Sequence, residues 1–307
     1  MSSLSRAVSL ALAAAFALLG VCHAATLVED FPSTSYVNGQ LDNQGTATGG
    51  WGSVWGTGST GTTGRVVIST ASNLTYSGGG YNITQTGTGL VQGNFGDGTG
   101  TNSAFRGSNR TFSTGMSGTI WFSILLSNTD STAHTGVSFN SDITGISDTP
   151  ATDYDVTPFR VDLSNTTAQL YFGSTTTAAA TGSGTYAVGS THLLVGSLTV
   201  GAGNDSVSVW IDPSDLSNLG AADLSSSGAA DLGGTLSRFG VFDYGLNDVQ
   251  AGGGNHGKVD ALRISDGGGS SSAAFTAVTG VSTVPEPGRT TLFSLGLAVL
   301  IMRRRRA

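Results

Sequence analysis

Residues 120–126 read Ile-Trp-Phe-Ser-Ile-Leu-Leu, an apolar run interrupted by a single serine. A short run of this kind, rich in aromatic and branched side chains, is typical of a strand that is buried in the core of a β-sandwich. The stretch therefore predicts a core strand and a β-rich fold. Trp121 belongs to this strand and is interpreted as a structural residue.

Other stretches show strand patterns as well. In residues 206–211 apolar side chains alternate with polar ones and with Trp210, and Pro213 then ends the strand. Residues 201–205, Gly-Ala-Gly-Asn-Asp, predict a hairpin turn before this strand. Trp210 alternates away from the apolar face, so it either faces solvent or packs in a second layer. Further strands are expected at residues 159–163, 168–172, 193–200, 239–244 and 259–264.

The composition favours a single large all-β domain. The chain has 307 residues with 47 glycines and dense serine and threonine, which disfavour long helices and favour turns and strands. Many short strands with Gly-rich turns and no convincing internal helix predict a β-sandwich or jelly roll in residues 25–266. Residues 267–272, Gly-Gly-Gly-Ser-Ser-Ser, are interpreted as the start of a Gly/Ser/Thr-rich linker over residues 267–284.

The first 24 residues have the pattern of a secretory signal peptide. Arg6 precedes an apolar stretch over residues 7–21, which ends at the small-residue site before Ala24. Signal peptidase is expected to cleave after Ala24, with Ala25 the near alternative. Cys22 raises the alternative of lipid attachment, which the bulky preceding valine disfavours. Cys22 is also the only cysteine, so the mature chain has no disulfide and no thiol chemistry.

The last residues predict a short membrane helix followed by a topology signal. Residues 292–302 are almost entirely apolar and span about 16 Å as a helix, whereas a membrane core is about 30 Å thick. Such a helix suits temporary residence in the inner membrane. The arginine cluster that follows the helix stays on the cytoplasmic side, so the residues before the helix are placed outside the membrane. A basic tail that binds nucleic acid leaves the apolar run unexplained. The cluster is Arg303, Arg304, Arg305 and Arg306.

The order of these C-terminal features resembles the PEP-CTERM sorting signal of Gram-negative bacteria. Pro285, Glu286 and Pro287, the short apolar helix and the terminal arginines occupy residues 285–307 in the order that this signal has. The resemblance implies recognition of the Pro-Glu-Pro motif by the membrane-embedded peptidase exosortase. It also implies removal of the tail and release to the cell surface or into extracellular polysaccharide. The resemblance covers only the end of the chain.

The charge of the exported body excludes one class of partner. Residues 25–284 hold 7 Lys or Arg and 19 Asp or Glu, which gives a net charge of −12. An acidic surface of this kind repels phosphate backbones, so we expect no nucleic-acid partner.

The body itself resembles concanavalin A-like (laminin-G-like) jelly-roll domains. The resemblance implies a fold and no activity, because members of this group mostly lack an assigned activity and fold alone does not give function. The matching segments are residues 29–31, 39–41 and 49–52, Trp55, and residues 193–213 and 260–264.

Catalysis has little support in the sequence. Glycosidases of this fold use two neighbouring carboxylic acids, and the chain has only Glu29 and Glu286, one near each end. Asp153 and Asp155 form a closely spaced pair, which is interpreted as a solvated or calcium-binding turn, with an Asp-based glycosidase as the alternative. We therefore expect a non-enzymatic protein.

Binding is the leading functional hypothesis. Trp51 and Trp55 lie in a Gly-rich segment where an indole face can stack on a sugar ring and neighbouring Asp or Asn side chains can bind its hydroxyls. The alternative is that both tryptophans fill the core beneath the loop. The expected function is thus an exported surface or matrix protein that holds polysaccharide. The alternative is a passive structural matrix protein with no defined ligand.

Calcium is the metal that the oxygen-rich turns would suit. The sequence shows no set of ligands that must converge, so the metal site stays unassigned, and no other cofactor is implied. The candidate ligands are Asp30, Asp153, Asp155 and Asp260.

Overall fold

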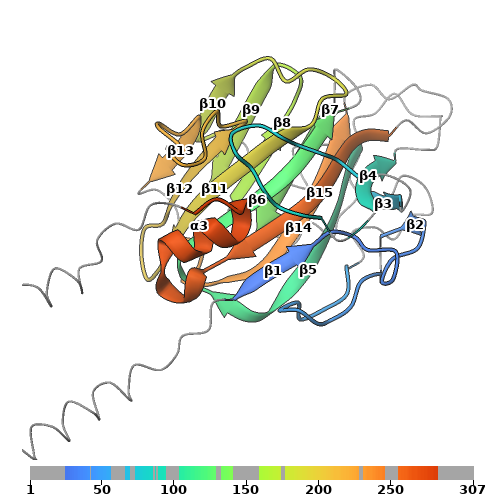
Figure 1. Cartoon of the computed structure of the whole chain (residues 1–307), viewed down its shortest axis with the longest axis horizontal. Coiled ribbons are helices and arrows are strands. Elements are labelled where there is room, and N and C mark those ends of the chain that lie inside the picture. Colours follow the sequence, from blue (N-terminus) through green and yellow to red (C-terminus); the bar gives the residue numbers. More distant parts are fainter. Residues whose placement is uncertain are drawn as a thin grey trace, which may run out of the picture.

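The computed structural model shows two antiparallel β-sheets packed face to face (Figure 1). The signal peptide with Ala24, the pair Asp153 and Asp155, residues 285–287 and the terminal arginines lie outside the residues that the structure describes. The described residues are 25–41, 43–56, 66–69, 73–85, 87, 89–94, 104–128, 133–140, 159–173, 177–227, 231–245 and 255–282.

Within the described residues, the larger sheet has nine strands. Their order is β13-β12-β11-β6-β15-β4-β3-β2, and β1 pairs with β15 outside this path. The strand predicted at residues 120–126 is confirmed as the middle of β6, which lies between β11 and β15. The strands are β1 (Thr26–Glu29), β2 (Gly39–Gln40), β3 (Val66–Ser69), β4 (Leu90–Asn94), β6 (Gly118–Asn128), β11 (His192–Val200), β12 (Ser206–Ile211), β13 (Leu224–Ser227) and β15 (Asn255–Ser265).

In the part of the chain that the structure describes, the smaller sheet has six strands in the order β10-β9-β8-β7-β14-β5. Each of its neighbouring pairs is antiparallel, as in the larger sheet. The other six strand stretches expected from the sequence, in both sheets, are also confirmed, within a few residues at their ends. The strands of this sheet are β5 (Ala104–Met116), β7 (Ala133–Phe139), β8 (Phe159–Leu163), β9 (Thr167–Phe172), β10 (Ala180–Ser183) and β14 (Leu236–Gly245).

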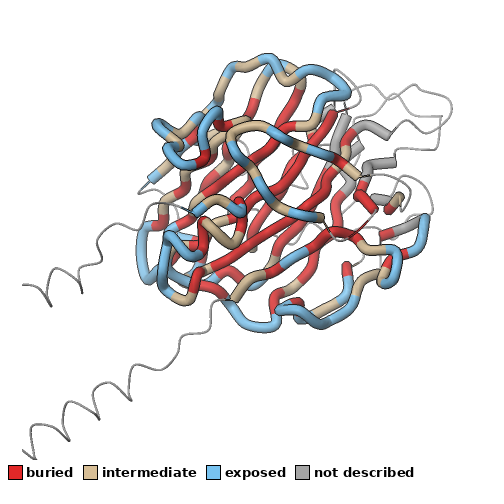
Figure 2. The backbone as a smooth tube through the Cα atoms, viewed as in Figure 1, coloured by how far each residue is buried: buried red, intermediate tan, exposed pale blue. Residues whose placement is uncertain are grey.

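The main core lies between the two sheets, where the buried positions of the strands face each other (Figure 2). Phe122 of β6 meets Phe139 of β7 and Phe159 of β8, with ring centroids 5.3 and 6.2 Å apart. Gly196 of β11 pairs directly with Phe122, and a Cβ at this position would overlap the phenyl ring. The glycine therefore makes room for the aromatic side chain that joins the sheets, and burial of each such ring contributes about 2 kcal/mol.

The C-terminal part of the body differs from the sequence prediction. The residues interpreted as the start of a linker form a 3-10 turn, η1 (Gly267–Gly269), and a helix, α3 (Ser271–Thr279). The Ser270 hydroxyl caps the helix by accepting from the amide of Ala273, and Gly280 ends it in the left-handed conformation. Buried Phe275 and Val278 dock the helix on the larger sheet. This segment is thus part of the folded body.

A second apolar cluster lies on the outer face of the larger sheet. Residues 73–85, here called the strap, cross in front of this sheet beside α3 (Figure 1). Leu74 of the strap and Phe275 of α3 pack there with outward-facing side chains such as Leu125 and Leu193. Among the described residues, no helix has the length and apolar character that a membrane crossing requires.

Candidate functional site

A pocket opens beside β1, where the edge of the larger sheet meets β5 of the smaller sheet. It encloses about 220 Å³ and is called the β1 pocket. Three parts of the chain form it: β1 with the residues after it, the following segment up to residue 51, and Arg110 of β5. The lining residues are Val28, Glu29, Asp30, Pro32, Ser35, Tyr36, Thr46, Thr48, Gly49, Trp51 and Arg110.

The segment around Trp51, which forms one wall of the pocket, is held in place by backbone pairing with β5. Trp51 forms an isolated antiparallel bridge with Phe112, and the amide of Gly52 donates to the carbonyl of Thr111 at 2.9 Å. Gly50 has φ +89°, and a Cβ there would strike the Leu27 side chain. The turn therefore needs glycine at this position, which explains the local Gly-Gly-Trp-Gly sequence.

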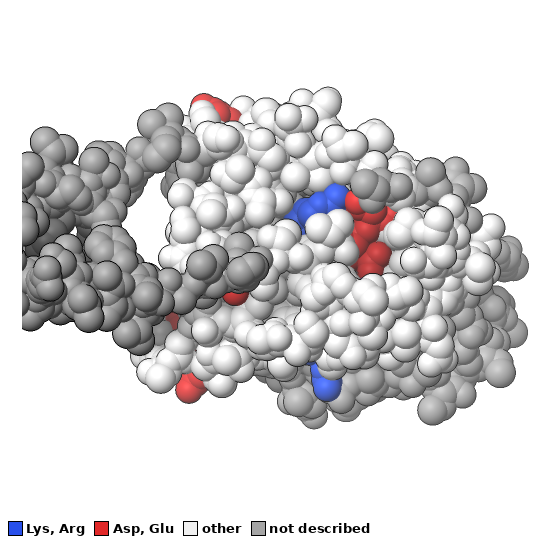
Figure 3. Space-filling model, turned by 60° about the horizontal axis from the view of Figure 1, so that its bottom comes forward, with Lys and Arg blue, Asp and Glu red and all other residues white. Residues whose placement is uncertain are grey.

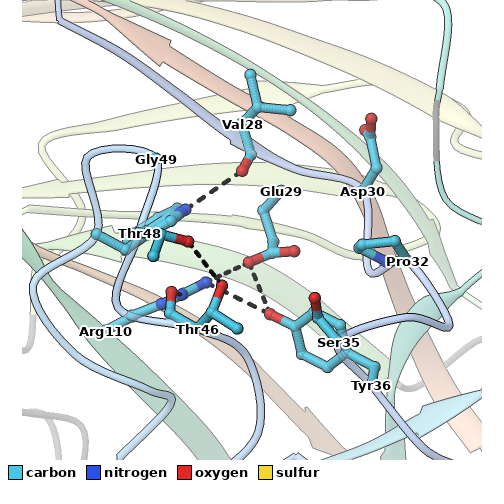
Figure 4. Close-up of a pocket in the computed structure, with 11 residues that line it drawn as sticks. Val28, Glu29, Asp30, Pro32, Ser35, Tyr36, Thr46, Thr48, Gly49 and Arg110 are labelled. Carbon is cyan, nitrogen blue, oxygen red and sulfur yellow. Dashed lines mark hydrogen bonds and ion pairs between the residues drawn. The ribbon is translucent and has the colours of Figure 1, made fainter.

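A buried ion pair between Glu29 and Arg110 forms the floor of the pocket (Figure 4). The side chains are 5% and 2% exposed, so the pair is almost fully removed from water. Arg110 also donates from Nε to the carbonyl of Ser53 at 2.7 Å and from Nη2 to the carbonyl of Thr46. The guanidinium lies 4.5 Å from the ring centroid of Trp51. The arginine thus joins four separate points of the wall.

Glu29 has further partners on both oxygens. The hydroxyl of Tyr36 donates to Oε2 at 2.7 Å, and the amide of Phe31 donates to Oε1 at 3.1 Å. Burial raises the pKa of Glu29, while the hydrogen bond from Tyr36 and the charge of Arg110 oppose this shift. Burial and the adjacent carboxylate raise the pKa of Tyr36, so the phenol keeps its proton and donates. Every polar atom of the carboxylate is therefore occupied.

The two tryptophans predicted to stack on a sugar are buried, at 3% exposure for Trp51 and 0% for Trp55. The indole of Trp51 donates to the carbonyl of Val28 at 3.2 Å, and that of Trp55 donates to the Tyr36 hydroxyl at 2.9 Å. Of the two readings of the sequence, the burial of both indoles agrees with the one in which the tryptophans fill the core beneath the loop. Trp51 still lines the β1 pocket, whereas Trp55 lies behind it.

Hydroxyl groups line the mouth of the pocket. Thr46 and Thr48 are exposed and share a hydrogen bond of 2.8 Å between their hydroxyls, and Ser35 is half-buried beside them. Figure 4 shows the Asp30 carboxylate turned away from the Glu29 and Arg110 group. Charged atoms are sparse over the face seen in Figure 3, where acidic and basic atoms adjoin at one place. The pocket therefore offers hydroxyls above an internally neutralised charge pair.

Two of the four aspartates that were candidates for calcium, Asp30 and Asp260, lie in the described residues and are occupied by protein groups. Asp30 forms a buried ion pair with Arg263, with N···O distances of 2.5 and 2.8 Å. Asp260 accepts from the amides of Leu74 and Ala261, at 2.8 and 2.7 Å, and from the side chain of Gln85 at 3.0 Å. In the part of the chain that the structure describes, no three His, Cys, Asp or Glu side chains gather as possible metal ligands.

Two further carboxylates outside the β1 pocket lie next to basic side chains. Asp162 of β8 is fully buried, with Arg160 Nε 3.4 Å from one oxygen and His134 Nδ1 3.5 Å from the other. Asp212 lies 2.6 Å from His192 Nδ1. Each of these carboxylates is thus engaged by a basic side chain, whereas glycoside hydrolysis uses a pair of carboxyl groups.

Sequence reasoning missed Arg110, Tyr36 and the two threonines of the pocket. Arg110 lies 81 positions from Glu29, and nothing in the spacing pairs them. The available signal was indirect, because an arginine inside a strand-like stretch of a body with only seven Lys or Arg residues suggests a buried partner.

No family model and no curated protein matches this chain. Several solved structures are similar over most of their length. The Crh5 transglycosylase has a TM-score of 0.41 and 14% identity, covering 80% of this chain and 85% of that one. Lectin II from Ulex europaeus has a TM-score of 0.35 and 11% identity, with coverage of 65% and 97%. The carbohydrate-binding module CBM66 from Bacillus subtilis has a TM-score of 0.32 and 12% identity, with coverage of 64% and 91%. Similarity at this level assigns no function to this chain.

Proposed function

We propose that this chain is an exported, exosortase-sorted protein of the cell surface or extracellular matrix. Its body binds polysaccharide and catalyses no reaction on it. The two ends of the sequence support export and sorting, and the acidic, Gly-rich sandwich suits an extracellular location. The body is proposed to be a concanavalin A-like jelly roll, which its two antiparallel sheets support.

The β1 pocket is the observation that carries polysaccharide binding. Its volume of about 220 Å³ is below the roughly 300–1,000 Å³ of sites for drug-sized ligands, which suits a single sugar unit or a chain end. Ser35, Thr46 and Thr48 present hydroxyls that exchange hydrogen bonds with sugar hydroxyls. Because Glu29 and Arg110 neutralise each other, the pocket suits a neutral, hydroxyl-rich ligand rather than an ion.

The same pair argues against catalysis in the pocket. A glycosidase needs one carboxyl group that donates a proton and a second that attacks or activates water. Glu29 and Asp30 both line the pocket, but each is held by a buried arginine, Arg110 or Arg263. Each carboxylate is therefore engaged by a cation of the protein.

Affinity electrophoresis tests the binding proposal. The purified chain is run through gels that contain neutral or acidic polysaccharides, with calcium and with chelator. We expect retardation by a neutral polysaccharide, and about tenfold weaker binding in the double variant Ser35→Ala/Thr48→Val, which removes two hydrogen-bonding groups. Ser190→Ala removes an exposed hydroxyl that is not part of the pocket and serves as the matched control. Equal retardation of the double variant and the wild type would exclude the pocket.

Sorting has its own test. The triple variant Pro285→Ala/Glu286→Ala/Pro287→Ala keeps the apolar helix and the arginines. We expect it to stay full-length in the inner membrane, whereas the wild type is shortened and released, as seen by immunoblotting of cell fractions. Normal release of the triple variant would remove exosortase recognition from the account.

A passive structural role is the second candidate. The burial of Trp51 and Trp55 favours it, because an exposed aromatic face is the usual mark of a sugar-binding surface. A folded protein that no polysaccharide retards would establish this candidate over the first.

A further inference from the structure

Part of the outer face of the larger sheet remains accessible. α3 and the strap pack over one part of this face, whereas the half formed by the ends of β6, β11, β12 and β13 carries half-buried and exposed side chains. The alternating burial of β12 shows that its polar positions point outward, away from the core. The outward residues of this half, here called the hydroxyl face, are Thr119, Ser197, Thr199, Ser206, Ser208, Ser225 and Ser227.

The strand register places these hydroxyls in rows across the sheet. Ser208 of β12 pairs with Ser225 of β13 on one side and with Ser197 of β11 on the other. Thr199 pairs with Ser206 and with Thr119 in the next row. Neighbouring strands lie about 4.8 Å apart, so the hydroxyls form a regular array rather than a scattered set.

Two stacked tryptophans border this array. Trp121 continues the row of Ser197, and its ring lies 5.7 Å from that of Trp210 with an interplanar angle of 18°. The edge of Phe275 and a hydrogen bond of 2.9 Å to Ser271 fix the indole of Trp121 from the side of α3. Both tryptophans are half-buried, so each keeps some surface in contact with solvent. A rigid aromatic pair beside hydroxyl rows suits the apolar and polar sides of a sugar ring.

The charge of the face selects the kind of polysaccharide. None of the nine side chains carries a charge, and the surrounding body has a net charge of −12, which repels an anionic chain. We propose that the hydroxyl face with Trp121 and Trp210 is a second binding surface, which takes a stretch of neutral polysaccharide along its length.

A second surface gives the protein a different role from simple retention. The β1 pocket is built from β1, the segment after it and β5, whereas the hydroxyl face is built from β6, β11, β12 and β13. Two separate sites on one body can hold two chains at once and thereby cross-link a matrix. Binding at the hydroxyl face rests on the proposed polysaccharide function but not on the pocket, whereas cross-linking requires both sites.

Charge insertion tests the face with little risk to the fold. Thr199 is exposed, so Thr199→Glu adds a charge without burying it. With the full-length chain in mild detergent, we expect about tenfold weaker binding to the neutral polysaccharide that retards the wild type, and a similar loss in Trp210→Ala. Val188→Glu is the matched control, because Val188 is 45% exposed and precedes the opposite end of β11.

The outcomes separate this inference from the proposed function. Ser35→Ala/Thr48→Val should keep the binding due to the face and lose the ability to cross-link, measured as the viscosity of a polysaccharide solution. If Thr199→Glu and Trp210→Ala bind and cross-link like the wild type, the face is not a site, although the pocket stands. If the wild type binds no neutral polysaccharide, both proposals fail.

Discussion

Glu29 and Arg110 are the residues on which the shape of the β1 pocket depends. The arginine bonds to the carbonyls of Ser53 and Thr46 and to the Glu29 carboxylate, so it ties the pocket wall to β5 and β1. A buried ion pair is costly to form, and its loss is costly as well, because the remaining partner is left as an uncompensated charge.

Glu29→Gln should therefore destabilise the protein strongly. The change leaves Arg110 buried without its counter-charge, and we expect a loss of about 3–5 kcal/mol in the free energy of unfolding, measured by urea denaturation. The double variant Glu29→Gln/Arg110→Met removes the stranded charge as well and should recover part of this loss. If the free energy of unfolding of Glu29→Gln lies within about 0.5 kcal/mol of the wild-type value, the ion pair contributes little to stability.

Asp260 predicts a dependence of stability on pH. Burial raises the pKa of Asp260 to about 7, although the amides of Leu74 and Ala261 oppose the shift. The native state thus keeps a proton on Asp260 at pH values where the unfolded chain has lost it, above the ordinary aspartate pKa near 4. The contribution of this group to stability is full below that value and is lost as pH rises toward about 7.

The comparison with Asp260→Asn isolates this effect. As pH rises from 4 to 7, we expect the free energy of unfolding of the wild type to fall relative to that of Asp260→Asn. The expected fall is up to about 1.4 kcal/mol per pH unit. Thermal unfolding over this range measures it, with Asp231→Asn at an exposed carboxylate as the control. A difference that does not change with pH would mean that Asp260 is ionised throughout.

The burial of Trp51 and Trp55 shows how far the sequence predicts the environment of a single residue. A tryptophan in a Gly-rich segment can face solvent or fill the wall of the loop, and the local residues do not distinguish the two. The decision comes from distant partners, since the carbonyl of Val28 and the hydroxyl of Tyr36 accept the two indole hydrogens inside the protein.

At the scale of elements, α3 is the part of the fold that the sequence prediction assigned wrongly. Its glycines and serines were interpreted as a linker, and they prove to be the turn, the cap and the exposed face of a short helix. The apolar positions Ala274, Phe275 and Val278 were the available signal, but two helical turns are too short for a clear periodicity. Seven of the fifteen described strands were predicted, because alternation and buried runs are local patterns, as in β6 and β12.

Phe275→Ala tests how α3 is held. The ring is 3% exposed and meets Trp121 edge-on at 4.9 Å, so its removal leaves a cavity between the helix and the sheet. We expect a loss of about 3 kcal/mol in the free energy of unfolding and a change in tryptophan fluorescence, because Trp121 loses its neighbour. Ser272→Ala on the exposed side of the same helix should change stability by less than about 0.5 kcal/mol. Equal stability of both variants would show that the helix does not depend on this contact.

At the scale of the whole molecule, the β-sandwich was predictable and the candidate site was not. Composition and strand patterns lead to two packed sheets without knowledge of the strand order. The β1 pocket, in contrast, needs Glu29 and Arg110, which come from strands of different sheets. Contacts of this kind depend on how the sheets are stacked, which no local pattern in the sequence contains.

Equilibrium cosedimentation with an insoluble neutral polysaccharide tests the central claim most directly. The account predicts saturable binding of the wild type, with a dissociation constant of about 1 mM or tighter. It also predicts weaker binding in Ser35→Ala/Thr48→Val and unchanged binding in Ser190→Ala. Absence of saturable binding by folded wild-type protein to every neutral polysaccharide tested would contradict the account and leave a passive component of the matrix.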